Sequence, residues 1–247
     1  MSARAVIHRS LRESVIAPAP RVTVIVPVLN EEARIGEQLD ALGAVGEIHE
    51  IIVVDGGSTD RTVDVARARG GAMVLTARQG RAAQMNAGAE RAPGDVLIFL
   101  HADVRLPRAA VRWIASALAE PAVVGGAFRT WTVAEGRRAW LAPLLHLADL
   151  RSRYSGLPYG DQALFVRADI FRQLGGFPDQ ALMEDLEFSR RLRDVGQIRT
   201  VPATVSVSGR RFLARPAYYT LLANVLPLLY RLGMPPRVLA SLYGNPR

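Results

Sequence analysis

An aspartate closely follows an apolar run in the middle of the sequence. Residues 96–100 read Val-Leu-Ile-Phe-Leu, and His101, Ala102 and Asp103 come next. In an open α/β sheet ligands bind at the carboxyl ends of the strands, so Asp103 is expected at the rim of such a crevice. A carboxylate there suits a divalent cation that also binds substrate phosphates. A plain strand-to-turn aspartate explains this stretch alone equally well, so other parts of the chain must decide.

Two earlier apolar runs also lead into polar residues that could meet a ligand. Residues 22–27 are rich in β-branched side chains and are followed by Asn30 and Glu31, and residues 51–54 are followed by Asp55. β-branched runs of this length are typical of buried parallel strands. The polar residues after them are therefore expected at the same edge of a sheet as Asp103.

An acidic pair opens a later helical segment. Glu184 and Asp185 begin residues 184–195, whose apolar side chains recur at helical spacing. A carboxylate placed beside a substrate hydroxyl can take its proton and act as a general base. Acids are also common in the first turn of a helix because they interact favourably with the helix dipole. The pair is a candidate for catalysis on the first ground and an ordinary helix start on the second.

Strands and helices alternate in the part of the chain that must position these residues. The predicted strands are 22–27, 51–55, 72–76 and 96–100, and the predicted helices between them are 33–42, 63–69 and 80–91. Such alternation predicts a parallel α/β sheet. After Asp103 we predict helices at 107–120, 140–150, 169–174 and 184–195, and strands at 123–131, 163–166 and 200–208.

Length and composition favour a single globular domain. The chain has 247 residues, of which 49% are hydrophobic and 22% charged, as is usual for soluble globular proteins. Residues 1–21 have neither the apolar core of a signal peptide nor a spanning helix. We therefore expect a tail over 1–21, one domain over 22–247 and a cytoplasmic location. The absence of cysteine excludes disulfides and thiolate metal sites.

The charge of the chain is strongly basic. All 31 basic residues are arginine, and the formal net charge is +8. Such a protein suits nucleic acid, a phosphorylated small molecule or an anionic membrane surface. The arginines are scattered, aromatic residues make up only 6%, and no nucleic-acid-binding motif occurs. No nucleic-acid partner is therefore expected.

Four motifs together resemble those of the family 2 glycosyltransferases of the GT-A fold. They are residues 26–31, 54–60, 101–103 and 184–188, and the resemblance extends over residues 22–208. It implies an α/β fold with a mostly parallel central sheet flanked by helices. It also implies an inverting, metal-dependent transfer of a sugar from a nucleotide-diphosphate sugar, such as a UDP- or GDP-sugar. The acceptor would be a hydroxyl group of a small molecule or of a lipid-linked carrier.

The resemblance implies that Asp103 binds Mg²⁺ or Mn²⁺, because it matches the last acid of the family's Asp-x-Asp motif. His101 replaces the first acid, and Ala102 lies between the two. The His101 imidazole could bind the metal or a ribose hydroxyl, with less negative charge to hold the metal. A plain strand-end histidine is the alternative reading of His101.

The resemblance also assigns residues to the nucleotide. Asp55 matches a residue that meets the base or ribose, and Gly56 stands where many family members have a second acid. Pro27 and Glu31 match residues that shape the nucleotide pocket. A strand terminator and a helix-start acid are their simpler interpretations.

Arginines are expected around the donor phosphates. Arg81 opens a predicted helix, where a cation is unfavourable, and so indicates an anion nearby. Arg129, Arg210 and Arg211 match basic positions of the family near the donor. A solvated surface position is the alternative for each of them.

On the acceptor side, Asp185 occupies the position of the family's proposed catalytic base, next to Glu184. Asp161 and Gln162 lie in a turn before a strand and are expected to line the acceptor pocket. The small size, His101 and the Gly-Asp-Gln turn also resemble the radical-SAM/selenodomain-associated transferases, a bacterial subgroup.

By the same resemblance, residues 22–103 form a nucleotide-binding half, 104–210 an acceptor-binding half and 211–247 a C-terminal helical segment. The apolar stretch 217–230 is too short and too interrupted to span a bilayer. A core or homodimer role is expected of it, and an interfacial helix in peripheral contact with a membrane is the alternative.

Other functions compete with this interpretation. A sugar-phosphate nucleotidyltransferase shares the fold, but residues 27–31 lack its glycine-rich, basic phosphate loop. No Gly-x-Gly-x-x-Gly follows the first strand, which disfavours a dinucleotide-dependent dehydrogenase. A catalytically silent nucleotide-binding module or a peripheral membrane protein is the rival of a different class. Asp103 and Asp185 count against it, while His101 leaves it open.

Overall fold

The computed structural model describes residues 20–133, 149, 156–210, 213 and 215–244. The predicted tail 1–21 and the predicted helix 140–150 lie almost wholly outside these residues, as does Arg211.

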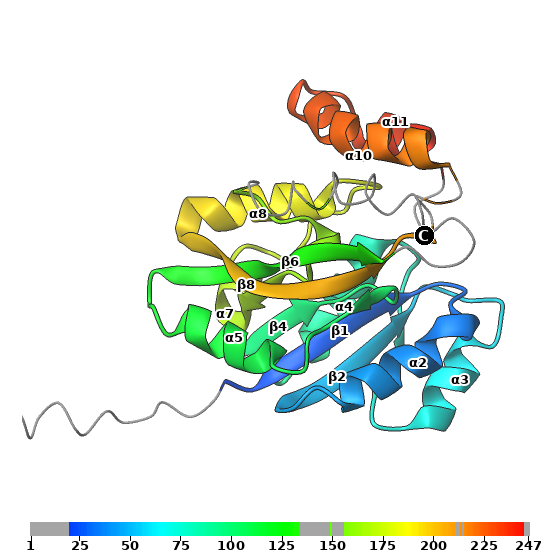
Figure 1. The fold of residues 1–247 in the computed structure, drawn as a ribbon, viewed down its shortest axis with the longest axis vertical. Coiled ribbons are helices and arrows are strands. Elements are labelled where there is room, and N and C mark those ends of the chain that lie inside the picture. Colours follow the sequence, from blue (N-terminus) through cyan, green and yellow to red (C-terminus); the bar gives the residue numbers. More distant parts are fainter. Residues whose placement is uncertain (1–19, 134–148, 150–155, 211–212, 214, 245–247) are drawn as a thin grey trace, which may run out of the picture.

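An eight-stranded sheet runs through the described part of the chain, in the order β3-β2-β1-β4-β7-β6-β8-β5 (Figure 1). The strands are β1 Val22–Val28, β2 Ile48–Asp55, β3 Met73–Thr76, β4 Val96–Phe99, β5 Val104–Arg105, β6 Val123–Val133, β7 Phe165–Arg167 and β8 Gln197–Ser208. Strands β3, β2, β1 and β4 are parallel neighbours. The direction reverses at β7, which is antiparallel to both β4 and β6. The predicted α/β fold is confirmed, with a reversed strand at the centre of the sheet.

Helices cover both faces of this sheet (Figure 1). The helices of the described residues are α2 Glu32–Gly43, α3 Thr62–Arg69, α4 Arg81–Arg91, α5 Ala110–Leu118, η2 Gly160–Gln162, α7 Ala168–Gln173, α8 Glu184–Val195, α10 Pro216–Arg231 and α11 Pro236–Tyr243. The apolar core on one face joins β1 and β4 to α2, α3 and α5. The core on the other face joins the same strands to α4, α7 and α8.

Alternation along β1 explains why both faces are apolar. Val24 and Val26 belong to the core beneath α2, whereas Ile25 between them belongs to the core beneath α4. All three side chains are fully buried. Because successive side chains of a strand point to opposite faces, a strand covered on both sides must be apolar throughout. Burial of each such side chain contributes about 1.5–3 kcal/mol.

The parallel pairing of β1 and β4 creates the rim on which the site is built. Ile25 of β1 is paired with Phe99 of β4, so both strands end at the same edge of the sheet. Pro27 therefore lies near the turn that contains His101 and Asp103. The rim expected from the sequence is formed by these strand ends.

The C-terminal helices α10 and α11 form a hairpin that packs beside the start of α8 (Figure 1). Its buried contacts join Leu222, Leu226 and Leu239 to Met183 and Leu186. The apolar stretch 217–230 thus supplies core side chains on one side, while other members of it are exposed.

Candidate active site

A pocket of about 220 Å³ lies at the carboxyl ends of β1 and β4. Eight of the predicted site residues line it: Pro27, Glu31, Arg81, His101, Ala102, Asp103, Asp161 and Asp185. These residues come from elements far apart in the sequence, so the fold brings most of the predicted site together.

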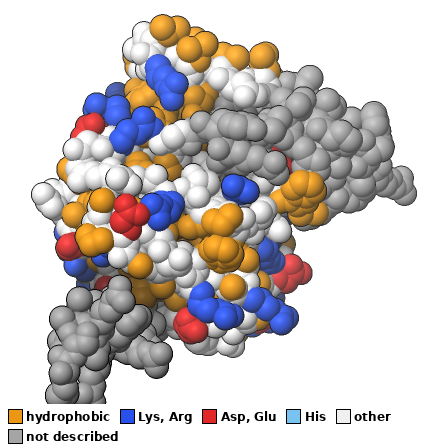
Figure 2. All heavy atoms as spheres, turned by 60° about the vertical axis from the view of Figure 1, so that its left-hand side comes forward, with side chains coloured by type: hydrophobic (Ala, Val, Ile, Leu, Met, Phe, Trp, Pro, Cys, Tyr) orange, Lys and Arg blue, Asp and Glu red, His pale blue; other side chains and the backbone are white. Residues whose placement is uncertain are grey.

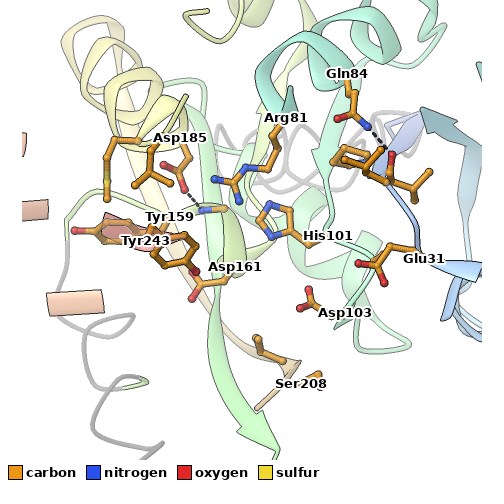
Figure 3. Close-up of a pocket in the computed structure, with 18 of the residues that line it drawn as sticks. Glu31, Arg81, Gln84, His101, Asp103, Tyr159, Asp161, Asp185, Ser208 and Tyr243 are labelled. Carbon is orange, nitrogen blue, oxygen red and sulfur yellow. Dashed lines mark hydrogen bonds between the residues drawn. The ribbon is translucent and has the colours of Figure 1, made fainter. Parts of the chain in front are cut away.

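The charged side chains occupy two sides of this pocket (Figure 3). Glu31 and Asp103 lie on one side, and Asp161 and Asp185 lie on the other. The side chain of His101 lies between the two groups, below the guanidinium of Arg81. A molecule in this pocket would therefore meet a carboxylate at each end.

The position of Asp185 is fixed by the start of α8. Phe188, one turn further on, is buried against the rings of Phe171 and Phe177, at centroid distances of 5.1 and 4.8 Å. Met183 precedes the helix with a φ of 66°, in the left-handed region that residues with a Cβ seldom adopt. Such backbone conformations persist where the surrounding structure enforces them, and they cluster at functional sites.

The Asp185 carboxylate is held by backbone donors. The Gly160 N–H donates to Oδ2 at 2.5 Å (Figure 3). The Leu186 N–H donates to Oδ1 at 2.7 Å. The residue is 9% exposed and lines the pocket. Two fixed donors orient the carboxylate while each oxygen keeps a second lone pair for a substrate proton.

Glu184 has a different environment from its neighbour. It is 1% exposed, does not line the pocket, and forms an ion pair with Arg81 Nε. Burial raises the pKa of Glu184 above its ordinary value, the charge of Asp185 raises it further, and Arg81 opposes both. Arg81, which the sequence placed near an anion, is paired with Glu184 in this structure, and its expected contact with donor phosphates stays a prediction.

Burial lowers the pKa of Arg81, but the charges of Glu184 and Asp185 outweigh this effect and raise its pKa overall. The guanidinium therefore remains a fixed positive charge at the pocket wall. It connects the start of α4 to the start of α8, across 103 residues of sequence.

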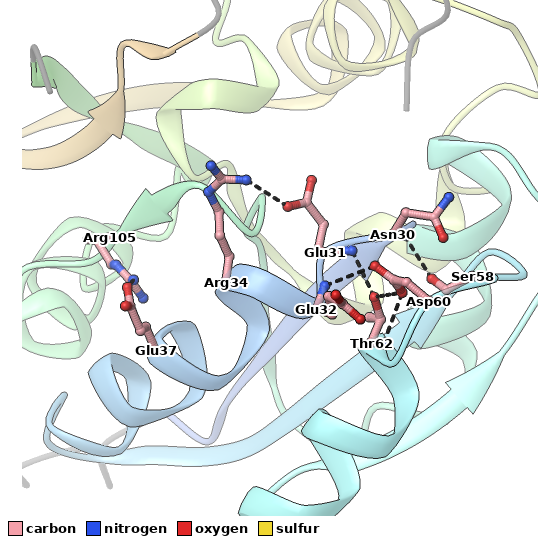
Figure 4. A network of polar contacts seen from close by, with 9 residues as sticks. All are labelled: Asn30, Glu31, Glu32, Arg34, Glu37, Ser58, Asp60, Thr62 and Arg105. Atoms are coloured by element: carbon pink, nitrogen blue, oxygen red, sulfur yellow. Dashed lines mark hydrogen bonds and ion pairs between the residues drawn. The ribbon is translucent and has the colours of Figure 1, made fainter. Parts of the chain in front are cut away.

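Hydrogen bonds between two loops hold Glu31 at the rim (Figure 4). The Glu31 N–H donates to Thr62 Oγ1 at 2.7 Å, and the Asn30 N–H donates to Ser58 Oγ at 2.8 Å. Arg34 forms an ion pair with the Glu31 carboxylate at 3.1 Å. These contacts tie the loop after β1 to the loop after β2 and fix both at the pocket edge.

Asp55 lies at the end of β2, as predicted, but its carboxylate is used locally. It accepts hydrogen bonds from the N–H groups of Gly57 and Ser58, at 3.0 and 3.1 Å. The residue is 3% exposed and is not among the residues that line the pocket. Its expected contact with a base or ribose stays a prediction.

Gly56 leaves room for Gln84 of α4. A Cβ at Gly56 would lie 2.9 Å from the Gln84 side chain. The Gln84 amide donates to the carbonyl oxygens of Val28 and Val54, each at 2.8 Å, and so ties the ends of β1 and β2 together. Gly56, which stands where many family members have a second acid, therefore lies against Gln84, a buried residue that lines the pocket.

Three other predicted residues do not line the pocket. Arg129 is exposed on β6, and Arg210 is exposed just after β8. Gln162 is 2% exposed, accepts a bond from the Tyr159 N–H at 2.9 Å and donates to the Phe128 carbonyl at 3.2 Å. Gln162 therefore braces the turn that presents Gly160, and the substrate contacts expected of these three residues stay predictions.

The residues around Asp103 suit a divalent metal ion that is bound partly by the protein and partly by phosphate groups of a substrate. Asp103 and His101 line the pocket, and the Ser208 N–H donates to the Asp103 carbonyl at 3.0 Å. Ser208 also lines the pocket, and its buried Oγ has no hydrogen-bond partner in the described part of the chain. Within that part, no group of three or more His, Asp or Glu side chains could hold a metal by itself. One carboxylate with substrate phosphates is a usual arrangement for Mg²⁺.

Several pocket residues are missed by the sequence motifs: Gln84, Tyr159, Leu182, Met183, Ser208, Leu222, Leu226, Pro227 and Tyr243. Ser208 follows the rule that ligands bind at strand ends, since it is the last residue of β8. The apolar residues of α10 and α11 carry no such indication, because only packing decides which side of a helix meets the pocket.

The chain has the architecture of the GT-A glycosyltransferases. It is similar to the mannosyltransferase PcManGT from Pyrobaculum calidifontis, solved in complex with GDP-Man and Mn²⁺, with a TM-score of 0.56 and 24% identity. That similarity covers 82% of this chain and 62% of the other. The chain belongs to glycosyl transferase family 2, whose family model matches residues 23–175.

Curated relatives include two enzymes whose names contain a lipid. The chain is 33% identical to the undecaprenyl-phosphate 4-deoxy-4-formamido-L-arabinose transferase of Pseudomonas aeruginosa (strain LESB58), over 61% of this chain and 47% of the relative. It is 27% identical to the beta-monoglucosyldiacylglycerol synthase of Synechocystis sp., over 71% of this chain and 40% of the relative. The chain thus spans half the length or less of these two relatives.

Gly160 lies close to two predicted site residues, His101 and Asp185. A Cβ there would lie 3.0 Å from the His101 ring and 3.1 Å from Asp185 Oδ2. We expect Gly160→Ala to displace both side chains, to lower kcat about ten-fold and to destabilise the fold by about 1–3 kcal/mol. Steady-state kinetics and urea unfolding measure the two effects.

Gly43→Ala is the matched control, because nothing lies within 4 Å of a Cβ at this helix end. It should leave activity unchanged and raise stability by at most about 1 kcal/mol. Full activity of Gly160→Ala would show that this close approach is not needed.

Proposed function

We propose that this protein is an inverting, metal-dependent glycosyltransferase that moves a sugar from a nucleotide-diphosphate sugar to an acceptor hydroxyl. The observation that supports this most is that Asp103 and Asp185 line one pocket from opposite sides (Figure 3). The donor diphosphate would lie on the side of Asp103, Glu31 and Pro27, and the acceptor hydroxyl would lie by Asp185.

In the proposed reaction, Asp185 takes the proton of the acceptor hydroxyl as the oxygen attacks the anomeric carbon. The new bond forms as the bond from that carbon to the diphosphate oxygen breaks, and the nucleoside diphosphate leaves. The backbone donors of Gly160 and Leu186 orient the carboxylate for this step. Attack from the side opposite the leaving group inverts the configuration.

Asp103 and His101 would hold a divalent cation, Mg²⁺ or Mn²⁺, which neutralises charge on the departing diphosphate when bound. The unpartnered Ser208 hydroxyl offers one more polar contact at this side of the pocket. The guanidinium of Arg81, which lies above His101 and is held by the ion pair with Glu184, would add a fixed positive charge between the two sides.

Residues 22–103 would supply the donor side and residues 104–210 the acceptor side of this reaction. The acceptor side is bounded by apolar side chains, among them Leu182, Leu222 and Leu226. Such a wall favours an acceptor with an apolar part, and the names of the two relatives include an undecaprenyl phosphate and a diacylglycerol. We therefore favour a lipid-linked acceptor over a purely polar one.

The donor site is tested by thermal unfolding with UDP, GDP, dTDP or CMP, each with and without Mn²⁺. A ligand that binds only the folded state stabilises it by about 2.7 kcal/mol at a concentration of 100 times Kd. We expect one nucleoside diphosphate to raise Tm in a manner that depends on Mn²⁺. Asp103→Asn should weaken that binding at least about ten-fold, because it removes a charged ligand of the metal.

Asp64→Asn, at an exposed position of α3, is the control for charge and should bind as the unaltered protein does. Absence of a shift with every nucleotide would contradict the proposed donor site. A shift unaffected by Asp103→Asn would contradict the metal assignment alone.

A further inference from the structure

The C-terminal hairpin exposes a stripe of large apolar side chains. Leu221, Leu228 and Leu232 are 62%, 56% and 75% exposed. Their spacing of seven and then four residues places them on one side of α10 and its end. Soluble proteins seldom leave so many neighbouring large apolar side chains in water without a partner.

The second helix of the hairpin continues this surface. Val238 and Leu242 of α11 are exposed and lie four residues apart, on one side of that helix. The Tyr218 hydroxyl of α10 donates to the Leu242 carbonyl at 2.5 Å, so the two helices meet at this surface. We name these residues the hairpin face: Tyr218, Leu221, Leu228, Leu232, Val238 and Leu242.

The core of the protein does not require these side chains. Leu222, Leu226 and Leu239, on the other side of the same helices, are at most 9% exposed and pack against the start of α8. The hairpin is thus already anchored by its inner side. The hairpin face must be explained by something outside the described chain.

The charged residues of the C-terminal segment all have one sign. Residues 211–247 contain five arginines and no aspartate or glutamate. Arg215, Arg231 and Arg237 are exposed on or beside the two helices. Figure 2 shows hydrophobic side chains along the top of the molecule, where the hairpin lies, with basic side chains beside them.

This combination favours an anionic bilayer over a second copy of the chain. A symmetric dimer through the hairpin face would bring the arginines of both copies together without an acidic partner from either hairpin. An anionic membrane surface attracts each arginine with about 1 kcal/mol and accepts the leucines among its acyl chains. No described helix is long and apolar enough to cross a membrane, which agrees with binding at the surface.

We propose that the hairpin face of α10 and α11 binds the surface of an anionic phospholipid bilayer. The inner side of the same helices supplies Leu222, Leu226 and Tyr243 to the pocket. Binding would thus place the pocket beside the membrane. The binding itself requires neither donor nor turnover, so it stands apart from the proposed reaction.

The test is co-sedimentation of the full chain with vesicles of phosphatidylcholine containing about 30% phosphatidylglycerol, and with pure phosphatidylcholine vesicles. We expect binding to the anionic vesicles that weakens as salt rises from about 0.1 to about 0.5 M. The triple variant Leu221→Glu, Leu228→Glu, Leu232→Glu should bind these vesicles at least about ten-fold more weakly, because it loses apolar contact with the bilayer and adds negative charge.

The matched control is Met73→Glu, Trp113→Glu, Val195→Glu. It adds the same charge at apolar residues of similar type that are 41%, 39% and 44% exposed elsewhere, and it should bind like the unaltered protein. Circular dichroism checks that both variants are folded, and Arg231→Gln, Arg237→Gln gives a milder variant that should bind less tightly.

Failure of the unaltered protein to bind anionic vesicles would overturn the proposal, as would equal loss in both triple variants. A dimer in light scattering that only the hairpin variant dissociates, without vesicle binding, would assign this face to a second copy instead. Each of these results leaves the donor-binding measurement unaffected.

Discussion

Asp185→Asn is expected to reduce turnover by about 10²–10⁴-fold, the usual contribution of a general base. The carboxylate lines the pocket and is oriented by the N–H groups of Gly160 and Leu186. An amide has nearly the same shape but cannot take a proton from the acceptor hydroxyl. Because Asp103 and Glu31 on the other side of the pocket are untouched, donor binding should be retained.

The substitution also has a structural cost, since the asparagine NH₂ group faces one of the two backbone donors. A loss of about 1–2 kcal/mol in the free energy of unfolding is expected. The decisive readout is therefore kcat measured together with the Tm shift caused by the nucleoside diphosphate and Mn²⁺.

Asp194→Asn, at an exposed position near the other end of α8, is the control on the same helix. It should keep both kcat and donor binding. Turnover of Asp185→Asn equal to that of the unaltered enzyme would rule out Asp185 as the base.

Arg81→Leu is expected to destabilise the protein by about 3–5 kcal/mol, because it leaves a buried carboxylate without its partner. The Glu184 side chain is 2% exposed and that of Arg81 is 25% exposed, so solvent screens this ion pair only weakly. The same change removes the positive charge beside Asp185 and should lower kcat as well. Urea unfolding measures the loss of stability. The dependence of the unfolding free energy on urea concentration should remain unchanged.

The destabilisation should depend on pH in a defined direction. The folded-state pKa of Glu184 is raised, so the native state keeps a proton at pH values at which the unfolded chain has released it. The contribution of Glu184 to the free energy of unfolding is fully present below its pKa in the unfolded chain. It is lost as the pH rises towards its pKa in the folded protein. Arg81 opposes the rise, and its removal raises the pKa of Glu184 further. The stability difference between Arg81→Leu and the unaltered protein should therefore grow as the pH rises above the unfolded-state pKa of a glutamate, about 4.3.

Arg78→Leu provides the matched control. Arg78 forms an ion pair with Asp179 at 2.7 Å, but the two side chains are 67% and 76% exposed. Such surface substitutions change stability by about 0.5 kcal/mol or less. A stability loss no larger in Arg81→Leu than in Arg78→Leu would show that the buried ion pair is not a major contribution.

The sequence by itself determined the strands that end at the site. Strands β1, β2 and β4 are covered on both faces of the sheet. Their sequences are therefore continuous apolar runs, which can be recognised as buried strands from composition alone. The bounds of α8, residues 184–195, are the same in sequence and structure, because its helical pattern ends at Gly196. Asp103, which follows the β4 run, could therefore be placed at the rim in advance. The role of Asp185, the second residue of α8, rests instead on the resemblance to the family's motif.

Only the tertiary structure decided how neighbouring residues divide their roles. Glu184 and Asp185 are adjacent in sequence, yet one is buried against Arg81 and the other lines the pocket. The direction of β7 and the fit of Gln84 against Gly56 likewise depend on contacts between distant segments. The pattern of apolar residues along a segment predicts whether that segment is a helix or a strand and which of its residues are buried. It does not show which residue of another element will pack against that segment, and here such packing orients the carboxylates of Glu184 and Asp185.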